Sequence, residues 1–497
     1  MVFKTVLKSN YFIIMKVLGN LFLLFSLVLL FPVLFCLFFP EEFSTAGYAF
    51  ILSAASSAVI GLLLKYIPRN NLSQEVVSIR EGAVIVLFSW MIGIFVSSLP
   101  YIFSGTFDFT HAIFESTSGW TTTGLTVVTD THSVPKLILV WRSVTQFLGG
   151  AGFAIIMMGS IIGPRGFGLY HAEGRVDNVV PNVKQSARII ARIYVIYAVA
   201  GMIALFLAGM NIFEAFNHSL TALATGGFST RNGSIGEFNS VAVEIVTIVL
   251  MFLGATGFGI HYALWKRDFK AVLKNGEPWL LLIIALVSTV LIAINGLGPA
   301  FDSVGEAVRK STFQSVSALT GTGFSTVDFS VRWPGFPLGM FILTVLMILG
   351  GCMDSTSGGL KQYRIFVLLK VIIESLLSFV RPRNTVSKIE IWKGQAKRYI
   401  DENVIKEILL VFSLYMITYT VGVTILCGYG FPVRDSMFEF ASALSGVGLS
   451  TGITNFTAPT GVLWTLITGM FLGRLEFLVV LYAVTKLIKD AWTVIRG

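Results

Sequence analysis

The sequence contains few charged residues for its length. Asp, Glu, Lys and Arg make up 13% of the 497 residues, and 55% of the residues are hydrophobic. A typical soluble domain carries about 25% charged residues. Apolar stretches of about 20 residues, the length that crosses a bilayer, recur along the whole chain. The scarcity of charge excludes a soluble protein, and no polar stretch is long enough to form a separate soluble domain.

Cysteine and enzyme motifs are also scarce. The three cysteines lie far apart, lack the spacing of metal ligands and cannot form a disulfide framework. The sequence has no Walker motif, no HExxH and no GxSxG. These absences leave an intramembrane enzyme as a distant alternative only. Such an enzyme needs a nucleophile, base or metal set that converges at one depth.

Lysine and arginine gather in alternate loops, which is the pattern of loops that face the cytoplasm. The net charge of +9 therefore does not point to nucleic acid as a partner. We expect both termini in the cytoplasm and the loop at Glu41 and Glu42 on the opposite side. The basic groups lie at Lys65 and Arg69, and within 165–192, 266–274, 361–398 and 486–496.

The order of apolar segments predicts an all-α polytopic membrane protein. An N-terminal hairpin of two helices, 1–70, precedes four repeats of long helix, short re-entrant pore loop and long helix around a pseudo-fourfold axis. We expect these repeats at 78–165, 185–268, 277–383 and 400–497, with a break in the last helix of the third. The expected segments are 11–39 and 47–64; 81–99, 109–123 and 136–163; 186–208, 212–224 and 240–265; 278–297, 305–320 and 335–380; and 403–427, 434–445 and 460–490.

One short polar phrase occurs four times in this apolar chain. It reads SGWTTTGLTV (118–127), TALATGGFST (221–230), SALTGTGFST (317–326) and SALSGVGLST (442–451). Aligned on one glycine, each phrase continues with leucine or phenylalanine and then a hydroxyl residue. A Leu-Gly pair, whose glycine lies 25–27 residues after the aligned one, supports the same register. We call Gly124, Gly227, Gly323 and Gly448 the aligned glycines.

These phrases predict an ion pathway. Unsatisfied backbone amides cost several kcal/mol each in lipid, so non-helical backbone is tolerated where it lines a water-filled path. A single Gly-Phe-Ser turn is more often a plain loop, but four in register, opposite the basic loops, favour a pore. Glycine allows backbone angles that aim carbonyls at an axis. Rings of carbonyl oxygens can replace the hydration shell of a cation.

The four phrases resemble those of the Trk/Ktr/HKT superfamily of cation transporters, and the N-terminal hairpin resembles the TrkH type within it. The resemblance covers nearly the whole chain. It implies that each repeat contributes one filter glycine, and that carbonyls at and before it hold potassium. One glycine per repeat implies looser selectivity than in a potassium channel. The implied potassium-binding residues are Thr122, Thr123, Gly124, Thr225, Gly226, Gly227, Gly321, Thr322, Gly323, Gly446, Val447 and Gly448.

A sodium-permeable or sodium-coupled transporter of the same architecture is the main alternative. The resemblance implies that serine at the first filter glycine accompanies sodium preference, and Gly124 stands at that place here. Potassium is therefore the expected transported ion, and metal binding is expected at the filter residues only. No covalent cofactor is expected.

The stretch ILGGCMDSTSGGLK (348–361) interrupts an apolar segment. Its glycines and hydroxyl residues cannot sustain a stable helix, and the resemblance implies an intramembrane gating loop beneath the filter. Asp354 departs from the small residue expected in relatives. It could attract cations or cap the following helix. The implied gate residues are Gly350, Gly351, Asp354, Ser355, Thr356, Gly358, Gly359 and Arg474.

Arg474 and Glu476 occur in MFLGRLEFL (470–478), which we interpret as part of an apolar helix. Charges within membrane segments are rare and are candidates for function. The resemblance implies that Arg474 projects toward the pore, where a cation opposes the passage of potassium. The alternative is an ion pair with an acid that joins two helices. Glu476 is two residues away, faces elsewhere on a helix and is not the natural partner.

The resemblance also implies a location and partners. We expect a homodimer in the inner membrane of a prokaryote, surrounded by lipid, with the filter toward the outside. A cytosolic ring of nucleotide-binding TrkA-type subunits is the expected partner. The basic connectors 165–192, 266–274 and 361–398 are candidate docking sites for this ring.

Four titratable residues near the short segments allow weaker predictions. For His111 and His218 we favour satisfied polar residues over a proton relay. Glu115 and Glu439 occupy equivalent positions in the first and fourth repeats. They could bond backbone amides behind the filter, which we favour, or add negative potential near the outer mouth.

Overall fold

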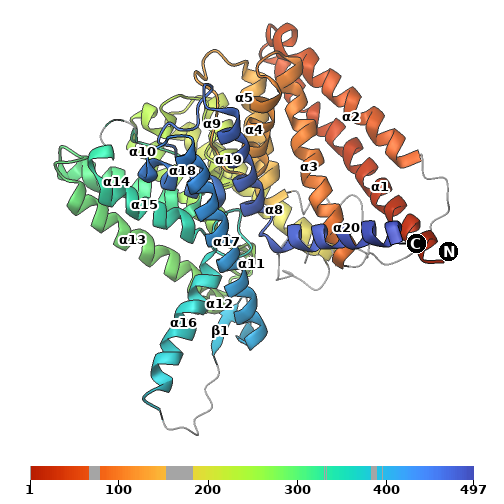
Figure 1. The fold of residues 1–497 in the computed structure, drawn as a ribbon. Helices are drawn as coiled ribbons and strands as arrows, with labels where there is room; N and C mark the ends of the chain where they lie inside the picture. Colours follow the sequence, from red (N-terminus) through yellow and green to blue (C-terminus); the bar gives the residue numbers. More distant parts are fainter. Residues whose placement is uncertain are drawn as a thin grey trace.

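The structure is a computed structural model that describes residues 2–66, 79–152, 183–329, 331, 333–381, 389–393 and 396–496. Helices dominate this part of the chain, and the fold is that of an all-α polytopic membrane protein, as predicted (Figure 1). Six of the described helices are long and apolar enough to cross a membrane. Two further pairs of helices, each bent sharply at a short break, meet the same criteria as pairs.

The N-terminal helices α1 (Val2–Leu29) and α2 (Tyr48–Tyr66) pack along each other. A Cβ built on Gly19 or on Gly61 would lie 2.9 Å from the other residue's carbonyl oxygen, so the small residues allow close approach of the two backbones. Ser57 Oγ also donates to the carbonyl of Phe22 across 2.7 Å. The 3₁₀ turn η1 (Pro32–Leu37) and the π turn η2 (Phe43–Gly47) connect the two helices.

The remaining helices form four groups, in each of which a helix of 21–27 residues is followed by one of 12–17 residues, which we call the short helix, and then by a third helix. The first group is α3 (Ile79–Phe103), α4 (Phe109–Trp120), α5 (Lys136–Phe147) and η3 (Leu148–Gly152). The second is α8 (Val183–Leu207), α9 (Ile212–Leu223), η4 (Ser234–Phe238), α10 (Val241–Ala255), α11 (Phe258–Trp265) and α12 (Phe269–Lys274). The third is α13 (Gly276–Gly296), α14 (Val304–Thr320), η5 (Trp333–Gly335), α15 (Pro337–Leu349) and α16 (Gln362–Ser378). The fourth is α17 (Glu402–Gly428), α18 (Val433–Ser445), α19 (Thr460–Arg474) and α20 (Leu478–Arg496).

The four groups pack in a closed ring. In each group the helix after the short helix packs against the short helix of the next group: α5 on α9, α10 on α14, and α15 on α18. Helix α19 of the fourth group closes the ring on α4 of the first. The C-terminal ends of all four short helices are therefore brought to the centre of the assembly.

The last helices of the second, third and fourth groups are broken, and two of these breaks correct the sequence prediction. The expected helix 240–265 bends by 104° between α10 and α11, and the expected helix 460–490 bends by 100° between α19 and α20. The interruption expected within 335–380 occupies the residues between Leu349 and Gln362. In the first group α5 passes into the π-helical η3, and the rest of the expected span to 163 lies outside the described residues.

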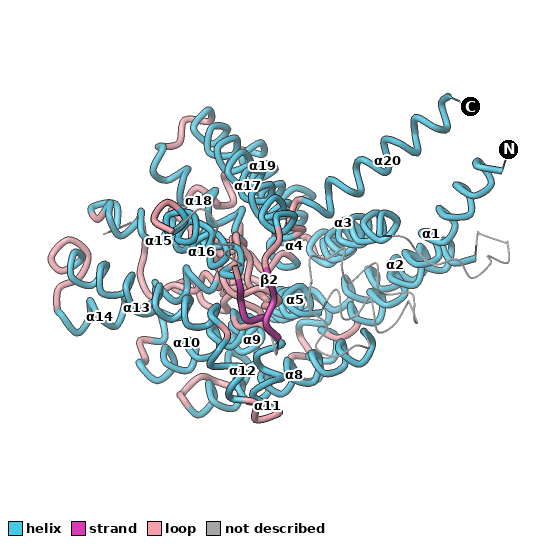
Figure 2. Tube along the Cα trace, turned by 90° about the horizontal axis from the view of Figure 1, so that it is seen from below, coloured by secondary structure: helices cyan, strands magenta, loops and turns pink. Residues whose placement is uncertain are grey.

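A short antiparallel hairpin, β1 (Glu390–Lys393) and β2 (Ala396–Tyr399), lies between α16 and α17 and was not predicted. Buried Val367, Ile391 and Ile408 join the hairpin to both helices. Figure 1 shows α16 and β1 extending away from the rest of the bundle, and Figure 2 shows the hairpin from below. Helix α20 crosses the end of the bundle and ends near the N-terminus (Figure 1), where Tyr11 donates to Asp490 across 3.1 Å.

Candidate ion pathway

The four short helices end in equivalent turns. In each group the amide of the residue before the aligned glycine donates to the carbonyl five residues earlier, which closes the last helical turn. The donors and acceptors are Thr123 and Ser118 (2.9 Å), Gly226 and Thr221 (2.9 Å), Thr322 and Ser317 (3.0 Å), and Val447 and Ser442 (2.9 Å).

The residue two places before each aligned glycine has a left-handed backbone. Gly321 and Gly446 occupy this position in the third and fourth groups with φ of 71° and 66°. Thr122 and Thr225 occupy it in the first two groups with φ of 54° and 50°. A β-branched residue rarely adopts this conformation, so the turn geometry is imposed on these threonines by their surroundings.

The aligned glycines form a ring in which each lies against a backbone carbonyl of the next group. Their φ angles are all between 75° and 101°, which favours glycine. A Cβ at any of them would overlap the carbonyl oxygen of the residue that precedes the next aligned glycine. The distances from such a Cβ to that oxygen are 2.2 Å (Gly124 to Gly226), 2.1 Å (Gly227 to Thr322), 1.7 Å (Gly323 to Val447) and 2.3 Å (Gly448 to Thr123).

The hydroxyl residue that follows each turn is held by the residue nine places before the aligned glycine. Glu115 accepts from Thr126 Oγ1 across 2.9 Å, and Glu439 accepts from Ser450 Oγ across 2.8 Å. The other two groups use different chemistry at the same position. There His218 Nε2 bonds Ser229 Oγ (2.9 Å) and Gln314 Nε2 bonds Thr326 Oγ1 (3.2 Å) and Ser325 Oγ (3.5 Å).

The two glutamates bond backbone amides behind the turns, as favoured from the sequence. Glu115 accepts from the amide of Val127, and Glu439 accepts from the amides of Thr451 and Thr454. Both carboxylates are fully buried. Arg142 neutralises Glu115 through a 2.7 Å ion pair, whereas Glu439 is surrounded by hydroxyl and amide donors.

The histidines behave as satisfied polar residues. His218 is buried, and its Nδ1 bonds the carbonyl of Glu214 across 2.8 Å while Nε2 reaches Ser229. His111 bonds the carboxylate of Asp108 (2.8 Å) and the carbonyl of Phe456 (2.9 Å). All four ring nitrogens therefore have protein partners.

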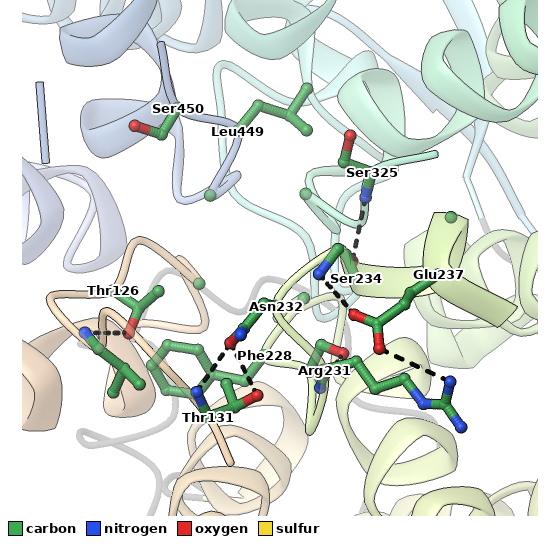
Figure 3. A pocket seen from close by; sticks show the side chains of 18 of the residues that line it. Thr126, Thr131, Phe228, Arg231, Asn232, Ser234, Glu237, Ser325, Leu449 and Ser450 are labelled. Carbon is green, nitrogen blue, oxygen red and sulfur yellow. Dashed lines mark hydrogen bonds and ion pairs between the residues drawn. The ribbon is translucent and has the colours of Figure 1, made fainter. Parts of the chain in front are cut away.

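A cavity of about 520 Å³ lies over the turns and includes all four aligned glycines in its lining. Figure 3 shows side chains of the second group, among them Arg231 and Glu237, reaching into it from the loop after α9. Arg231 is ion-paired with Glu214 (2.7 Å) and Glu237 (3.7 Å). Its charge and that of Arg142, which also lines the cavity and pairs with Glu115, are thus balanced by carboxylates.

The loop after α9 crosses this cavity and joins three groups. Asn232 accepts from the amide (2.7 Å) and hydroxyl (2.9 Å) of Thr131, and its amide group donates to Asp130 across 2.9 Å. On the other side Ser234 Oγ accepts from the amide of Ser325 across 3.2 Å (Figure 3). The hydrogen bond from Asn232, with a smaller contribution from the His132 amide, lowers the pKa of Asp130.

The segment between α15 and α16, residues 350–361, folds back beneath the turns. Gly350 and Gly359 have positive φ and pack backbone against backbone, with a Cβ on Gly350 only 2.2 Å from the Gly358 oxygen. A Cβ on Gly358 would lie 2.0 Å from the oxygen of Ser445, at the end of α18. Gly351 donates to Ser357 Oγ across 3.0 Å. The glycines therefore allow this loop to lie directly against the turns.

Thr356 is the central contact of this loop. Its hydroxyl bonds the carbonyl of Gly254 (2.9 Å) and the hydroxyl of Thr225 (3.0 Å), the left-handed residue of the second turn. Its carbonyl accepts from Arg474 Nη1 across 2.8 Å. One residue thus connects the loop, a turn and the predicted pore arginine.

Arg474 bridges the loop and the first group. Besides Thr356, its guanidinium donates to the carbonyls of Gly149 (2.6 Å) and Gly150 (2.9 Å) in η3. Arg474 is the last residue of α19, and Glu476 and Phe477 have left-handed backbones. The two charges therefore lie at a helix break, which corrects their predicted place inside a continuous helix.

Glu476 contacts the end of the same loop. It pairs with Lys361 and with Arg364, each across 2.5 Å, where α16 begins. The prediction that it is not the partner of Arg474 agrees with these contacts. The break after α19 therefore holds the loop at its centre, through Arg474, and at its end, through Glu476.

Asp354 does not cap the following helix, which corrects one of the two predicted roles. Helix α16 begins eight residues later at Gln362, and Lys361 is its N-cap residue, without a capping side chain. Asp354 has a left-handed backbone with φ of 57°, and its carbonyl accepts from the amide of Phe258. Its place is in the loop itself, beside the break between α10 and α11.

Comparison with known proteins places the chain in a family. A family model described as "TrkH: Cation transport protein" matches residues 54–492. The chain belongs to the TrkH family of cation transport proteins.

Curated members of the TrkH family match the chain over almost its full length. The Trk system potassium uptake protein TrkH of Escherichia coli K12 is 32% identical over 488 residues, 95% of this chain and 98% of that protein. The TrkH protein of Halomonas elongata is 30% identical and covers 95% and 98%. The crystal structure of the potassium transporter TrkH from Vibrio parahaemolyticus superposes with a TM-score of 0.83 at 28% identity, over 95% of this chain and 98% of that one.

Membership of the TrkH family decides the broad class of the protein. The family and its curated members are cation transporters, so the chain is a multi-pass membrane transporter and not an enzyme. The resemblance found in the sequence is confirmed.

The bonds of His218 and Gln314 to the hydroxyl residues after the second and third turns were not predicted from the sequence. The position nine residues before the aligned glycine holds Glu, His, Gln and Glu, which do not share a residue type. The constant spacing of nine residues to the aligned glycine was the sequence signal that could have revealed their common role. The Leu-Gly pair also had an unrecognised reason: a Cβ on Gly149, Gly254 or Gly473 would lie 1.8–2.4 Å from a carbonyl oxygen near the end of a short helix.

The predicted docking connectors are described in part. The connector 266–274 includes the short helix α12, and 361–398 includes α16, β1 and part of β2. Most of the connector 165–192 lies outside the described residues.

Proposed function

We propose that this protein takes up potassium across the cytoplasmic membrane of a prokaryote, through a filter of backbone carbonyls on the outer side. The filter residues are those at the four turns, 122–124, 225–227, 321–323 and 446–448. The curated relatives named as potassium uptake proteins support the choice of ion. The basic loops support a cytoplasmic location for both termini.

The ring of aligned glycines is the observation that carries this proposal. Each glycine lies against a carbonyl of the next group, and the fourth closes on the first. A closed ring of oxygens is the arrangement that replaces the hydration shell of a cation. The C-terminal ends of the short helices add partial negative charge beneath this ring. No side-chain carboxylate is needed to compensate the ion's charge.

Flux into proteoliposomes tests the ion and the driving force. Purified protein is reconstituted, and gradients of potassium, sodium and protons are imposed one at a time. We expect saturable potassium uptake that exceeds sodium uptake at equal concentration. Sodium that passes as readily as potassium would replace this assignment with the sodium-permeable alternative. A proton or sodium gradient that drives potassium uphill would identify coupled transport.

We further propose that the loop 350–359 and Arg474 form the gate. The loop lies directly beneath the turns, and Arg474 ties it to η3 of the first group. The gate residues are Gly350, Gly351, Asp354, Ser355, Thr356, Gly358, Gly359 and Arg474. A fixed guanidinium on the path opposes a cation electrostatically, and its hydrogen bonds keep the loop in place.

Replacing Arg474 tests the gate. Arg474→Ala removes the charge and the three hydrogen bonds to Thr356, Gly149 and Gly150, so we expect higher potassium flux. Arg434→Ala is the matched control, because Arg434 is exposed and pairs with Asp435 away from the loop. Unchanged or lower flux in well-folded Arg474→Ala would argue against this gate.

The partners are also proposals. We propose a homodimer that binds a cytosolic nucleotide-binding ring of the TrkA type, because the curated relatives belong to the Trk system. The basic residues of the connector 266–274 and of 361–398 are the docking candidates. Light scattering of the purified protein measures the dimer. Replacing Lys266, Arg267, Lys270 and Lys274 by serine should weaken co-purification of the ring, whereas unchanged binding would exclude this connector.

A further inference from the structure

We infer that Gln146 is a positioning residue: it holds part of the ion filter in place and thereby determines the preference for potassium over sodium. The inference rests on the proposed function and assigns one side chain a role in it. Gln146 lies in α5 of the first group, but it contacts the turn of the second group. It is fully buried.

The carboxamide of Gln146 holds both peptide groups that flank Gly227. Its Nε2 donates to the carbonyl of Gly226 across 2.5 Å, and its Oε1 accepts from the amide of Phe228 across 3.1 Å. The Gly226 carbonyl is the oxygen that lies against Gly124 in the ring. A carbonyl oxygen has two lone pairs, so it can accept from Gln146 and still face an ion.

Position 146 differs from its counterparts in the other groups. Three residues before the glycine of the Leu-Gly pair, the other groups have Met251, Met347 and Met470, all buried. Methionine has nearly the same length as glutamine but cannot donate a hydrogen bond. Gln146 therefore fills a common packing position with a group that bonds the filter in one of the four places.

The residue that faces Gln146 also differs from its counterparts in the other three groups. Before the aligned glycine the other groups have Thr123, Thr322 and Val447, whereas the second group has Gly226. A Cβ built on Gly226 would lie 2.4–2.8 Å from the carboxamide atoms of Gln146. Gly226 does not have a positive φ, so its backbone does not require glycine. The missing side chain makes room for the carboxamide.

This contact fixes the position of one ring oxygen. A smaller ion such as sodium is bound well only if the oxygens move inward, and two hydrogen bonds on adjacent peptide groups resist that movement. Without them the second turn can adapt to either ion. We therefore expect loss of the contact to lower discrimination more than it lowers total flux.

The experiment compares Gln146→Met with wild type in proteoliposomes. The substitution conserves volume and copies the residue of the other three groups. We expect the ratio of potassium to sodium uptake to fall about threefold to tenfold, the factor that corresponds to one net hydrogen bond, with potassium transport retained. Met347→Leu, at the equivalent position of the third group, is the control and should keep the wild-type ratio.

A second variant reaches the same contact from the other side. Gly226→Ala leaves Gln146 in place but displaces its carboxamide, and we expect the same fall in the ratio. If Gln146→Met does not fold, the ratio of potassium to sodium uptake by Gly226→Ala tests the inference instead. A ratio that stays at the wild-type value in both folded variants, or fluxes of both ions that fall in proportion, would overturn the inference. Wild-type protein without a preference for potassium would instead refute the proposed function.

Discussion

Substituting alanine at two glycines four residues apart separates backbone strain from crowding in the proposed filter. Gly448 and Gly452 both follow α18 and have positive φ, of 101° and 96°. A Cβ on Gly448 would lie 2.3 Å from the carbonyl oxygen of Thr123, whereas a Cβ on Gly452 would meet nothing within 4 Å. Both alanine variants therefore carry similar strain, about 1–2 kcal/mol for an L-residue in a left-handed conformation. The variants differ in the overlap with the ring.

The overlap at Gly448 sets the size of the effect on transport. An ordinary contact of a Cβ is 3.4–4 Å, so the Thr123 oxygen has to move by about 1 Å. In enzymes a misplacement of about 1 Å can lower the reaction rate about a hundredfold, and we take this as the scale for a ring of oxygens that must fit an ion. We expect potassium or rubidium uptake by Gly448→Ala to fall by about this factor, and uptake by Gly452→Ala to stay near wild type.

The assay combines tracer uptake in proteoliposomes with thermal unfolding in detergent. Thermal unfolding shows whether the two variants are folded and similarly destabilised. A difference in ion uptake between them then reports the crowding of the ring alone. Uptake and selectivity of folded Gly448→Ala that match those of Gly452→Ala would refute the reasoning, because the ring would then not be part of the path.

Two further predictions concern the supports of the turns. Glu439→Leu leaves the buried donors of Ser450, Thr451 and Thr454 without their acceptor and should lower the free energy of unfolding by about 3 kcal/mol. Thermal unfolding should show a smaller loss of stability for Glu439→Gln and almost none for exposed Glu402→Gln. An equal loss in all three variants would contradict this prediction. Asp108 caps α4, and the His111 amide is the main cause of its lowered pKa. A lowered pKa means that the cap stabilises fully above the unfolded pKa of about 3.9 and is lost as pH falls through the folded pKa. Asp108→Ala should therefore lose about 1 kcal/mol at neutral pH. Asp108→Asn should lose only the part that depends on the charge, so its difference from wild type should be largest at neutral pH and shrink as pH falls below about 4, and a difference in unfolding free energy that does not change with pH would exclude the charge as the cause.

The repeated features of the fold could be predicted because each is local. The four phrases place a helix end, a hydroxyl and a glycine within ten residues, and the same hydrogen bonds form in every copy. The break in the last helix of the third group could be predicted for the same reason, from Gly350, Gly351, Gly358 and Gly359. These signals depend on backbone conformation, which the residue type constrains directly.

The features that were missed depend on contacts between distant segments. Each bent pair is apolar enough on average to read as one membrane span, so hydropathy alone does not reveal the bends near Thr256 and Leu475. The ion pairs of Glu476 with Lys361 and Arg364 join the fourth group to the third. Residues this far apart in the sequence have no fixed spacing from which such a pair could be predicted. The Gln146–Gly226 contact is of the same kind. It becomes visible only when the helix of one group is compared with the turn of the next.

The closed ring has a consequence for the order in which the protein is made. The turn of the third group rests on Val447, and the turn of the fourth rests on Thr123. A chain released before the fourth group has been synthesised has an open ring, in which the Thr123 oxygen of the first turn and Gly323 of the third turn each lack their neighbour. With the ring as the proposed filter, such a fragment lacks a complete filter, and we expect it not to conduct potassium selectively across the membrane.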